Sequence, residues 1–294
     1  MFGRVGYGRP VASTKKLFNA LTRRGPHKVL CGDLAFAGLP GIVYTPASGK
    51  NLPGVAFGHD WITSAERYRG TLEHLASWGI VAAAPNTETS LAPSVLTLAY
   101  DLGTALDIIS GVRLGGGDIS VHPGKLGLAG HGFGASAAVF AAAGMRDKPR
   151  AVVAAYPLVS SPPAEKPAAG LTVPGLILTD PGDPMTLRSN AVELARAWKP
   201  ATLRSTSKTK AGGLVEGRRL ATVVGLPGAD KGTQRIVRAL MTGYFLHMLA
   251  GEKDKGPYRA FADPEGALPK TELMDPFADD PVDLENKVVA LLKP

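Results

Sequence analysis

The segment with the clearest chemical pattern is KLGLAGHGFGAS, residues 125–136. An apolar, strand-like run ends in GHGFG, residues 130–134, and an Ala-rich stretch typical of a helix follows it. This is the strand–turn–helix layout of a nucleophile elbow, G-x-S-x-G, in which a strained turn holds a nucleophile at the top of a sheet. Small outer residues let the strand and the helix pack closely. The pattern therefore predicts a turn of the catalytic kind, with residue 132 at its centre.

Alternating strand-like and helix-like segments surround this turn and must position it. Strands are expected at 41–45, 54–57, 80–84, 125–129, 151–155 and 175–179, and helices at 65–78, 94–109, 135–143, 187–198 and 234–249. Repeated units of this length predict an α/β fold with a mostly parallel central sheet and helices on both faces. In such sheets, functional residues collect in the loops at the carboxyl ends of the strands. Those loops are expected to begin at Gly58, Pro85, Gly130, Tyr156 and Asp180.

Over roughly residues 40–250, the chain resembles the α/β-hydrolases, and within them the cutinase-like polyester (PET) hydrolases and the related dienelactone hydrolases. The resemblance implies an α/β-hydrolase fold. The segment VAFGHD, residues 55–60, looks like the strand and loop that supply one oxyanion-hole amide in that family, near His59. By the same resemblance, the second amide would belong to Phe133.

The resemblance also implies a place for the acid of the catalytic triad. The segment VPGLILTDPGDP, residues 173–184, looks like the strand and turn that present this acid, which Asp183 matches best. Leu158 stands where the polyester hydrolases carry an aromatic residue after the preceding strand. These positions outline one cleft at the carboxyl edge of the predicted sheet.

Two departures from the family pattern decide the expected activity. The nucleophile position is Gly132, which has no side chain and cannot form an acyl-enzyme. The loop that carries the family's catalytic His corresponds to KAGGLVEGRR, residues 210–219, which contains no His. Acyl transfer needs a nucleophile, a base and oxyanion donors, and the first two are missing. The sequence therefore predicts a catalytically degenerate pseudo-hydrolase with a binding, scaffolding or regulatory role.

The alternative hypothesis is a carboxylic-ester hydrolase that uses another nucleophile or an activated water. Its candidates are Asp60, as a carboxylate nucleophile, and the histidines His59 and His131, which begin or end loops beside the predicted cleft. His247 follows Asp183 but lies in a helical stretch, where a packed side chain is the simpler interpretation. Neither hypothesis calls for a cofactor or a bound metal.

Charge is distributed unevenly along the 294 residues, whose formal net charge is +8. Residues 1–28 contain seven basic residues and no acid, whereas residues 261–285 contain eight acids and only Lys270 as a base. The sequence accordingly divides into a basic N-terminal extension at 1–39, an α/β-hydrolase-like domain at 40–252 and an acidic tail at 253–294. A short terminal helix is expected at 282–292. Solvated termini are the simplest interpretation of such charge runs.

A second interpretation is that these cations bind an anion. Four basic side chains fall in or beside the degenerate His loop, at the mouth of the predicted cleft: Lys208, Lys210, Arg218 and Arg219. The segment STKKLFNAL, residues 13–21, combines lysines with apolar residues and could form a short interfacial helix. The expected partner is therefore an unknown protein, an anionic lipid or a small ligand. Nucleic acid is disfavoured, because no DNA- or RNA-binding motif is present and aromatic residues make up only 6%.

The remaining composition limits the class of protein. A single cysteine, Cys31, excludes an internal disulfide framework and a Cys-based zinc site. No apolar run reaches the roughly 18 residues of a membrane-spanning helix. Basic residues interrupt the first 24 positions, so a secretory signal is not expected there. The expected location is the cytoplasm, including the periphery of the inner membrane face.

Overall fold

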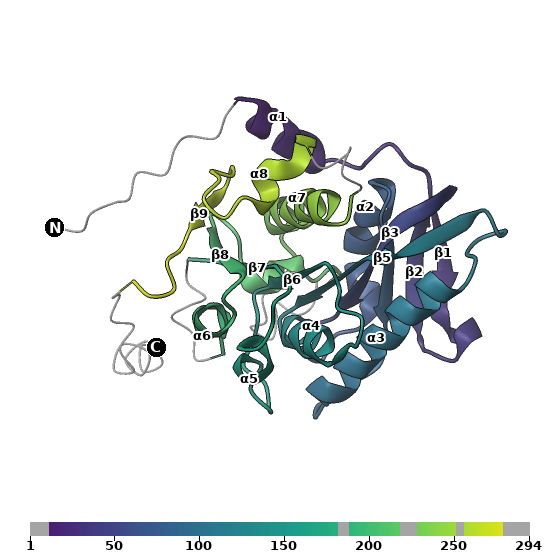
Figure 1. Cartoon of the computed structure of the whole chain (residues 1–294), viewed down its shortest axis with the longest axis horizontal. Helices are drawn as coiled ribbons and strands as arrows, with labels where there is room; N and C mark the ends of the chain where they lie inside the picture. The colour runs from purple at the N-terminus through teal and green to yellow at the C-terminus, as the bar shows by residue number, and fades with distance from the viewer. Residues whose placement is uncertain (1–11, 182–187, 218–227, 251–255, 279–294) are drawn as a thin grey trace.

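The structure, a computed structural model, describes residues 12–181, 188–217, 228–250 and 256–278. Within these ranges a nine-stranded sheet forms the centre of the molecule, in the order β1-β2-β4-β3-β5-β6-β7-β8-β9 (Figure 1). Its strands are β1 (Val29–Asp33), β2 (Gly41–Pro46), β3 (Gly49–Gly58), β4 (Val81–Pro85), β5 (Ile119–His131), β6 (Ala151–Ala155), β7 (Gly175–Thr179), β8 (Ala201–Thr206) and β9 (Thr271–Leu273). The strands from β4 through β8 pair in parallel, and β1, β2 and β9 add antiparallel edges. The predicted α/β class is confirmed.

Helices cover both faces of the sheet (Figure 1). One face carries α3 (Val95–Gly111), α4 (Phe133–Gly144), α5 (Glu165–Ala168) and α6 (Ala191–Ala197). The other carries α1 (Ala12–Leu21), α2 (Arg69–Ser77), α7 (Lys231–Met248) and α8 (Arg259–Ala262). Strands β4 and β6 are apolar at every position because successive side chains enter opposite cores. In β6, for example, Val152 and Ala154 face the first helical layer, whereas Val153 and Ala155 face the second.

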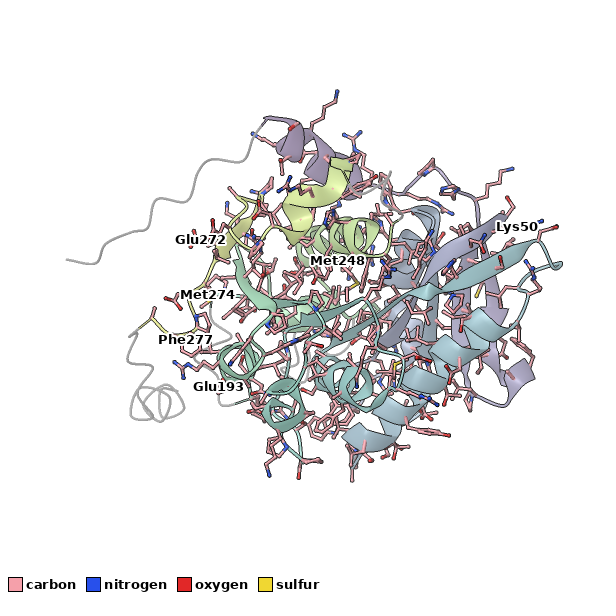
Figure 2. All side chains as sticks on the ribbon, in the orientation of Figure 1. Lys50, Glu193, Met248, Glu272, Met274 and Phe277 are labelled. Carbon is pink, nitrogen blue, oxygen red and sulfur yellow. The ribbon has the colours of Figure 1, made fainter. Side chains whose placement is uncertain are left out.

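Segments near both ends of the chain join this domain. Helix α1 packs on α7, where Phe18 and Leu21 are buried. Strand β1 extends the sheet beside β2, and β9 extends it beside β8. After β9 the chain runs along α6, where Arg196 Nε donates a hydrogen bond of 2.7 Å to the carbonyl of Pro276. Figure 2 shows Met274 and Phe277 following this course, on the same side of the molecule as Glu193 of α6.

Most predicted elements occur, with shifted boundaries. The helix expected at 65–78 is a 3₁₀ turn, Ala65–Tyr68, followed by α2. Helix α3 begins where expected because Ser94 accepts a hydrogen bond from the amide of Thr97. The short helix expected at 282–292 lies outside the described residues. In the described part of the chain, we find no helix with both the length and the apolar character needed to cross a membrane.

Candidate functional site

The turn between β5 and α4 has the conformation expected of a nucleophile elbow. Gly132 has φ +56° and ψ −117°, a backbone geometry that residues with a side chain rarely adopt. Its amide donates to the carbonyl of Ala155 at 3.0 Å, and its carbonyl accepts from the amide of Leu158 at 3.2 Å. A Cβ on Gly130 would overlap the backbone of Gly134, which explains the small outer residues of the motif. The local sequence therefore places residue 132 at the carboxyl edge of the sheet, as predicted from its pattern.

The space above Gly132 is filled by the carboxylate of Asp60. Asp60 Oδ1 accepts hydrogen bonds from the amide of Trp61 at 2.8 Å and from the amide of Phe133 at 3.1 Å. A Cβ built on Gly132 would overlap this carboxylate and would lie only 2.5 Å from its Cγ. The Phe133 amide, assigned by resemblance to the oxyanion hole, is thus already bonded to an anion of the same chain.

A buried chain of hydrogen bonds runs from Asp60 beneath the turn. The Asp60 amide donates to Tyr68 Oη at 3.1 Å, and Tyr68 Oη lies 2.7 Å from His131 Nδ1. His131 Nε2 lies 2.8 Å from the carbonyl of Ala211, which can only accept, so this nitrogen carries the proton and Nδ1 accepts from Tyr68. Tyr68 and His131 are almost completely buried. His131 is therefore engaged at both ring nitrogens and serves to fix the surrounding loops.

The loop that replaces the expected His loop is held at its backbone. Asp180, the residue directly after β7, accepts a hydrogen bond at Oδ2 from the amide of Ala211 at 2.7 Å. Because His131 binds the Ala211 carbonyl, both polar backbone groups of this residue are bonded to side chains from the ends of β5 and β7, the two strands on either side of β6. Asp183, the acid predicted by resemblance, lies outside the described residues.

The other predicted cleft residues have structural partners. His59 is fully buried, with Nδ1 2.9 Å from the Asp60 carbonyl and Nε2 2.6 Å from the Thr87 carbonyl. Leu158 is half-buried, and its carbonyl accepts a hydrogen bond of 2.6 Å from Ser136 Oγ. The buried hydroxyl closest to Gly132 in the sequence, that of Ser136, is therefore already bonded. His247 is half-buried in α7.

Only two of the four proposed anion-binding residues can be placed. Lys208 and Lys210 are exposed on either side of the buried Thr209, just before Ala211. Arg218 and Arg219 lie outside the described residues. The two lysines thus lie just before Ala211, whose backbone binds Asp180 and His131.

Sequence reasoning missed Tyr68 and Asp180 as site residues. Tyr68 belongs to a 3₁₀ turn whose apolar pattern resembles that of an ordinary helix, so nothing marks its hydroxyl as part of the site. Asp180 carried a signal, since it is the first residue after a fully buried strand.

Strained backbone is concentrated in the loops around this site. Ile62, Glu88 and Tyr156 follow β3, β4 and β6 and have φ values of +49°, +54° and +50°. Left-handed geometry is costly for a β-branched residue such as Ile62, and strain of this kind clusters at functional sites. Ile62 is also exposed, and beside it the guanidinium of Arg188 lies 5.2 Å from the ring centre of Trp61.

The exposed rim near these strained loops is apolar. Leu91 and Val159 are more than half exposed, and their loops are joined to Trp61 and Arg188. Trp61 Nε1 donates to the Leu91 carbonyl at 3.1 Å, and the Val159 amide donates to the Arg188 carbonyl at 2.9 Å. The loops after β3, β4 and β6 thus present Ile62, Leu91 and Val159 to solvent, with the Arg188 guanidinium beside them.

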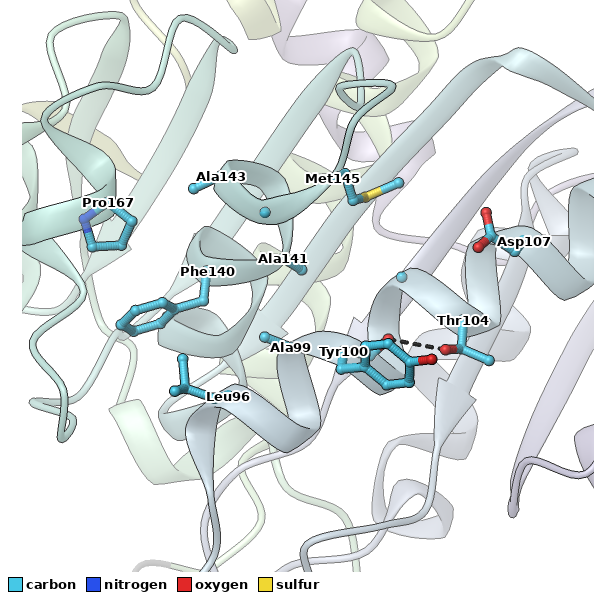
Figure 3. A pocket seen from close by; sticks show the side chains of 12 residues that line it. Leu96, Ala99, Tyr100, Thr104, Asp107, Phe140, Ala141, Ala143, Met145 and Pro167 are labelled. Atoms are coloured by element: carbon cyan, nitrogen blue, oxygen red, sulfur yellow. Dashed lines mark hydrogen bonds between the residues drawn. The ribbon is translucent and has the colours of Figure 1, made fainter.

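A separate groove of about 620 Å³ lies between α3 and α4. Figure 3 shows Tyr100 and Leu96 of α3 on one side, and Phe140 of α4 with Met145, the residue after α4, on the other. None of the predicted site residues lines it.

Gly132, at the centre of the elbow, has no side chain, and the carboxylate that lies against it belongs to Asp60. Asp60 Oδ1 accepts two backbone amides, which stabilise the carboxylate and reduce its nucleophilicity. In the described residues, no group of three or more His, Cys, Asp or Glu side chains is placed to hold a metal ion. No protein-family model matches the chain, and a search of curated proteins finds no significant match.

Proposed function

We propose that this protein is an α/β-hydrolase-like pseudo-hydrolase, related to the cutinase-like polyester and dienelactone hydrolases, whose role is binding rather than catalysis. The strand order, the GHGFG turn and the loops at the carboxyl strand ends are compatible with that fold. The observation that carries the proposal is the Asp60 carboxylate, bonded to the Phe133 amide directly above Gly132.

The position of this carboxylate opposes acyl transfer for an electrostatic reason. An oxyanion hole works because its donors are aimed at a position where negative charge develops. Here that position borders an existing negative charge, and the donor at Phe133 is already used. A tetrahedral oxyanion at the same place would be repelled by Asp60 and would lack the hydrogen bond that normally stabilises it.

The binding role is supported by the loops that surround the closed turn. Strained residues such as Ile62 persist only where their surroundings hold them, and here they border the apolar rim around Trp61. We propose that this rim, with the Arg188 cation beside it, contacts a partner or ligand at the carboxyl edge of the sheet. The parent reaction is lost, whereas the surface that once met a substrate is retained.

The test is turnover of short- and medium-chain p-nitrophenyl esters together with labelling by a fluorophosphonate. We expect no label, and no rate that differs between the wild type, Asp60→Ala and the matched control Asp107→Ala. Asp107 is an exposed acid on α3, remote from the turn. Turnover that disappears in Asp60→Ala but persists in Asp107→Ala would show that the carboxylate is catalytic. That result would replace our proposal by the ester-hydrolase alternative.

A further inference from the structure

Positive charge is concentrated on one of the two helical layers. Residues 12–28, which contain α1 and the turn after it, carry five basic residues and no acid. Helix α7, on which α1 packs, carries three basic residues and no acid. On the opposite face of the sheet, α3 carries two acids and no base, and α4 carries no charged residue. The asymmetry therefore belongs to the folded surface as well as to the sequence.

Most of these cations form no ion pair with any residue that the structure describes. In the described part of the chain, Arg24 pairs with Glu73 at 2.8 Å and Arg238 pairs with Glu216 at 2.7 Å. The remaining basic residues of residues 12–28 and of α7 are exposed and form no ion pair with a described residue: Lys15, Lys16, Arg23, Lys28, Lys231 and Arg235. We call these six residues the cationic face. Figure 2 shows nitrogen-tipped side chains projecting outward from α1, away from the body of the molecule.

The apolar side of α1 is not available to a partner. Phe18 and Leu21 are 3% and 0% exposed, and both belong to the core shared with α7. The short interfacial helix considered from the sequence would need these side chains to enter a bilayer. With α1 packed as it is, Lys15 and Lys16 point outward while the apolar residues point inward, so contact through this helix is electrostatic without insertion.

We infer that the cationic face binds the surface of an anionic lipid bilayer. Six exposed cations of α1, the segment after it and α7 pair with no described acid. Such a set fits a surface of spread negative charge, toward which each Lys or Arg contributes independently. A specific small anion would instead need a buried, converging set of donors. This is a second binding surface, separate from the apolar rim around Trp61 to which the binding role was assigned above.

A single-stranded nucleic acid is the less suitable polyanion. Such proteins combine a basic groove with exposed aromatic side chains on which bases stack. Among the described residues, the strongly exposed aromatics are Phe36, Tyr100 and Phe277, and none belongs to α1 or α7. The cationic face therefore offers charge without a stacking platform.

The test compares binding of the full chain to vesicles of phosphatidylcholine alone and of phosphatidylcholine with about one-third phosphatidylserine. We expect binding only to the anionic vesicles. Raising the salt from about 0.1 M to about 1 M shortens the screening length from about 10 Å to about 3 Å and should abolish it. The Lys15→Gln/Lys16→Gln variant should bind about 25-fold more weakly, at about fivefold for each cation.

The matched control is Lys166→Gln/Lys199→Gln, which removes two exposed cations from the opposite helical layer. Its affinity should stay within about twofold of the wild type. An equal loss in both variants, or equal binding to neutral vesicles, would overturn the inference. Tighter binding to duplex DNA, with the same dependence on Lys15 and Lys16, would assign the face to nucleic acid instead. Each result is independent of the ester assay, so either proposal can fail while the other stands.

Discussion

The tightest link between structure and proposed function is the packing of Asp60 against Gly132, and it can be tested by a thermodynamic cycle. The perturbation is Gly132→Ala, which adds a single carbon at the centre of the turn. That carbon would overlap the Asp60 carboxylate, so either the carboxylate or the turn must move. Asp60→Ala removes the obstacle and leaves the backbone geometry of the turn unchanged.

The expected magnitudes follow from the contacts. Gly132→Ala forces a side chain into a sparsely populated backbone geometry with positive φ, at about 1–2 kcal/mol, and displaces a carboxylate that two amides bind. With about 1–2 kcal/mol for the weakened hydrogen bonds, the total is about 3 kcal/mol. Asp60→Ala alone should cost about 2 kcal/mol for the same lost bonds. In the double variant no carboxylate remains to be displaced. The loss in the free energy of unfolding should therefore be about 3–4 kcal/mol, compared with about 5 kcal/mol for the sum of the two single variants.

The assay is urea unfolding of the wild type, the two single variants and the double variant, at one pH and one salt concentration. We expect a coupling free energy of about 1–2 kcal/mol between residues 60 and 132. The control cycle pairs Gly132→Ala with Asp107→Ala, which should be additive because Asp107 is exposed on α3. Additivity within about 0.5 kcal/mol in both cycles would refute the view that the two positions constrain each other.

Two further predictions concern buried ionisable groups. Burial lowers the pKa of His74 to about 4, whereas an unfolded histidine has a pKa near 6.5. Below pH 6.5 the unfolded chain therefore binds a proton that the folded protein does not. The free energy of unfolding should fall by up to about 3 kcal/mol as the pH falls from about 6.5 to about 4. Urea unfolding across this range should show the slope in the wild type and lose it in His74→Gln; an equal slope in both would contradict the assignment. The buried Arg204 donates to the carbonyls of Asp263 and Gly266, each at 2.8 Å, and burial lowers its pKa to about 10. Arg204→Met should cost about 2–4 kcal/mol in urea unfolding and speed amide exchange at 256–266, because both carbonyls lose their donor; unchanged exchange would show that Arg204 does not hold this segment.

The sequence predicts the central strands well because their burial produces a pattern within a few consecutive residues. Strands covered on both faces are continuous apolar runs, and β4, β6 and β7 have no exposed position. The missed strands lack this signal. Strand β1, VLCGD, is exposed along most of its length, β8 contains the buried Arg204, and β9 has only three residues. Their identity as strands depends on neighbours that the local pattern does not reveal.

The candidate site divides in the same way. The conformation of Gly132 could be predicted because the turn, its small flanking residues and the helix after it are contiguous. The position of the Asp60 carboxylate could not be predicted, because its partner Phe133 is 73 residues away in the sequence. The bond also goes to a backbone amide, a group that every residue type except proline has, so the residue type gives no signal. The roles of Asp180 and His131 were hidden for the same reason, since both bind the backbone of Ala211.

These hydrogen bonds determine whether the polar groups of the site are available to a substrate. In a working acyl-transfer enzyme, the oxyanion donors and the base must stay available for groups that the substrate brings. Here the Phe133 amide, both ring nitrogens of His131 and both backbone groups of Ala211 are bonded within the chain. Gly132 permits this closed arrangement, because any side chain there would meet Asp60. If the proposal of a pseudo-hydrolase is right, Gly132→Ser alone should therefore clash with Asp60 and produce no esterase activity, because the Phe133 amide and both ring nitrogens of His131 are already bonded.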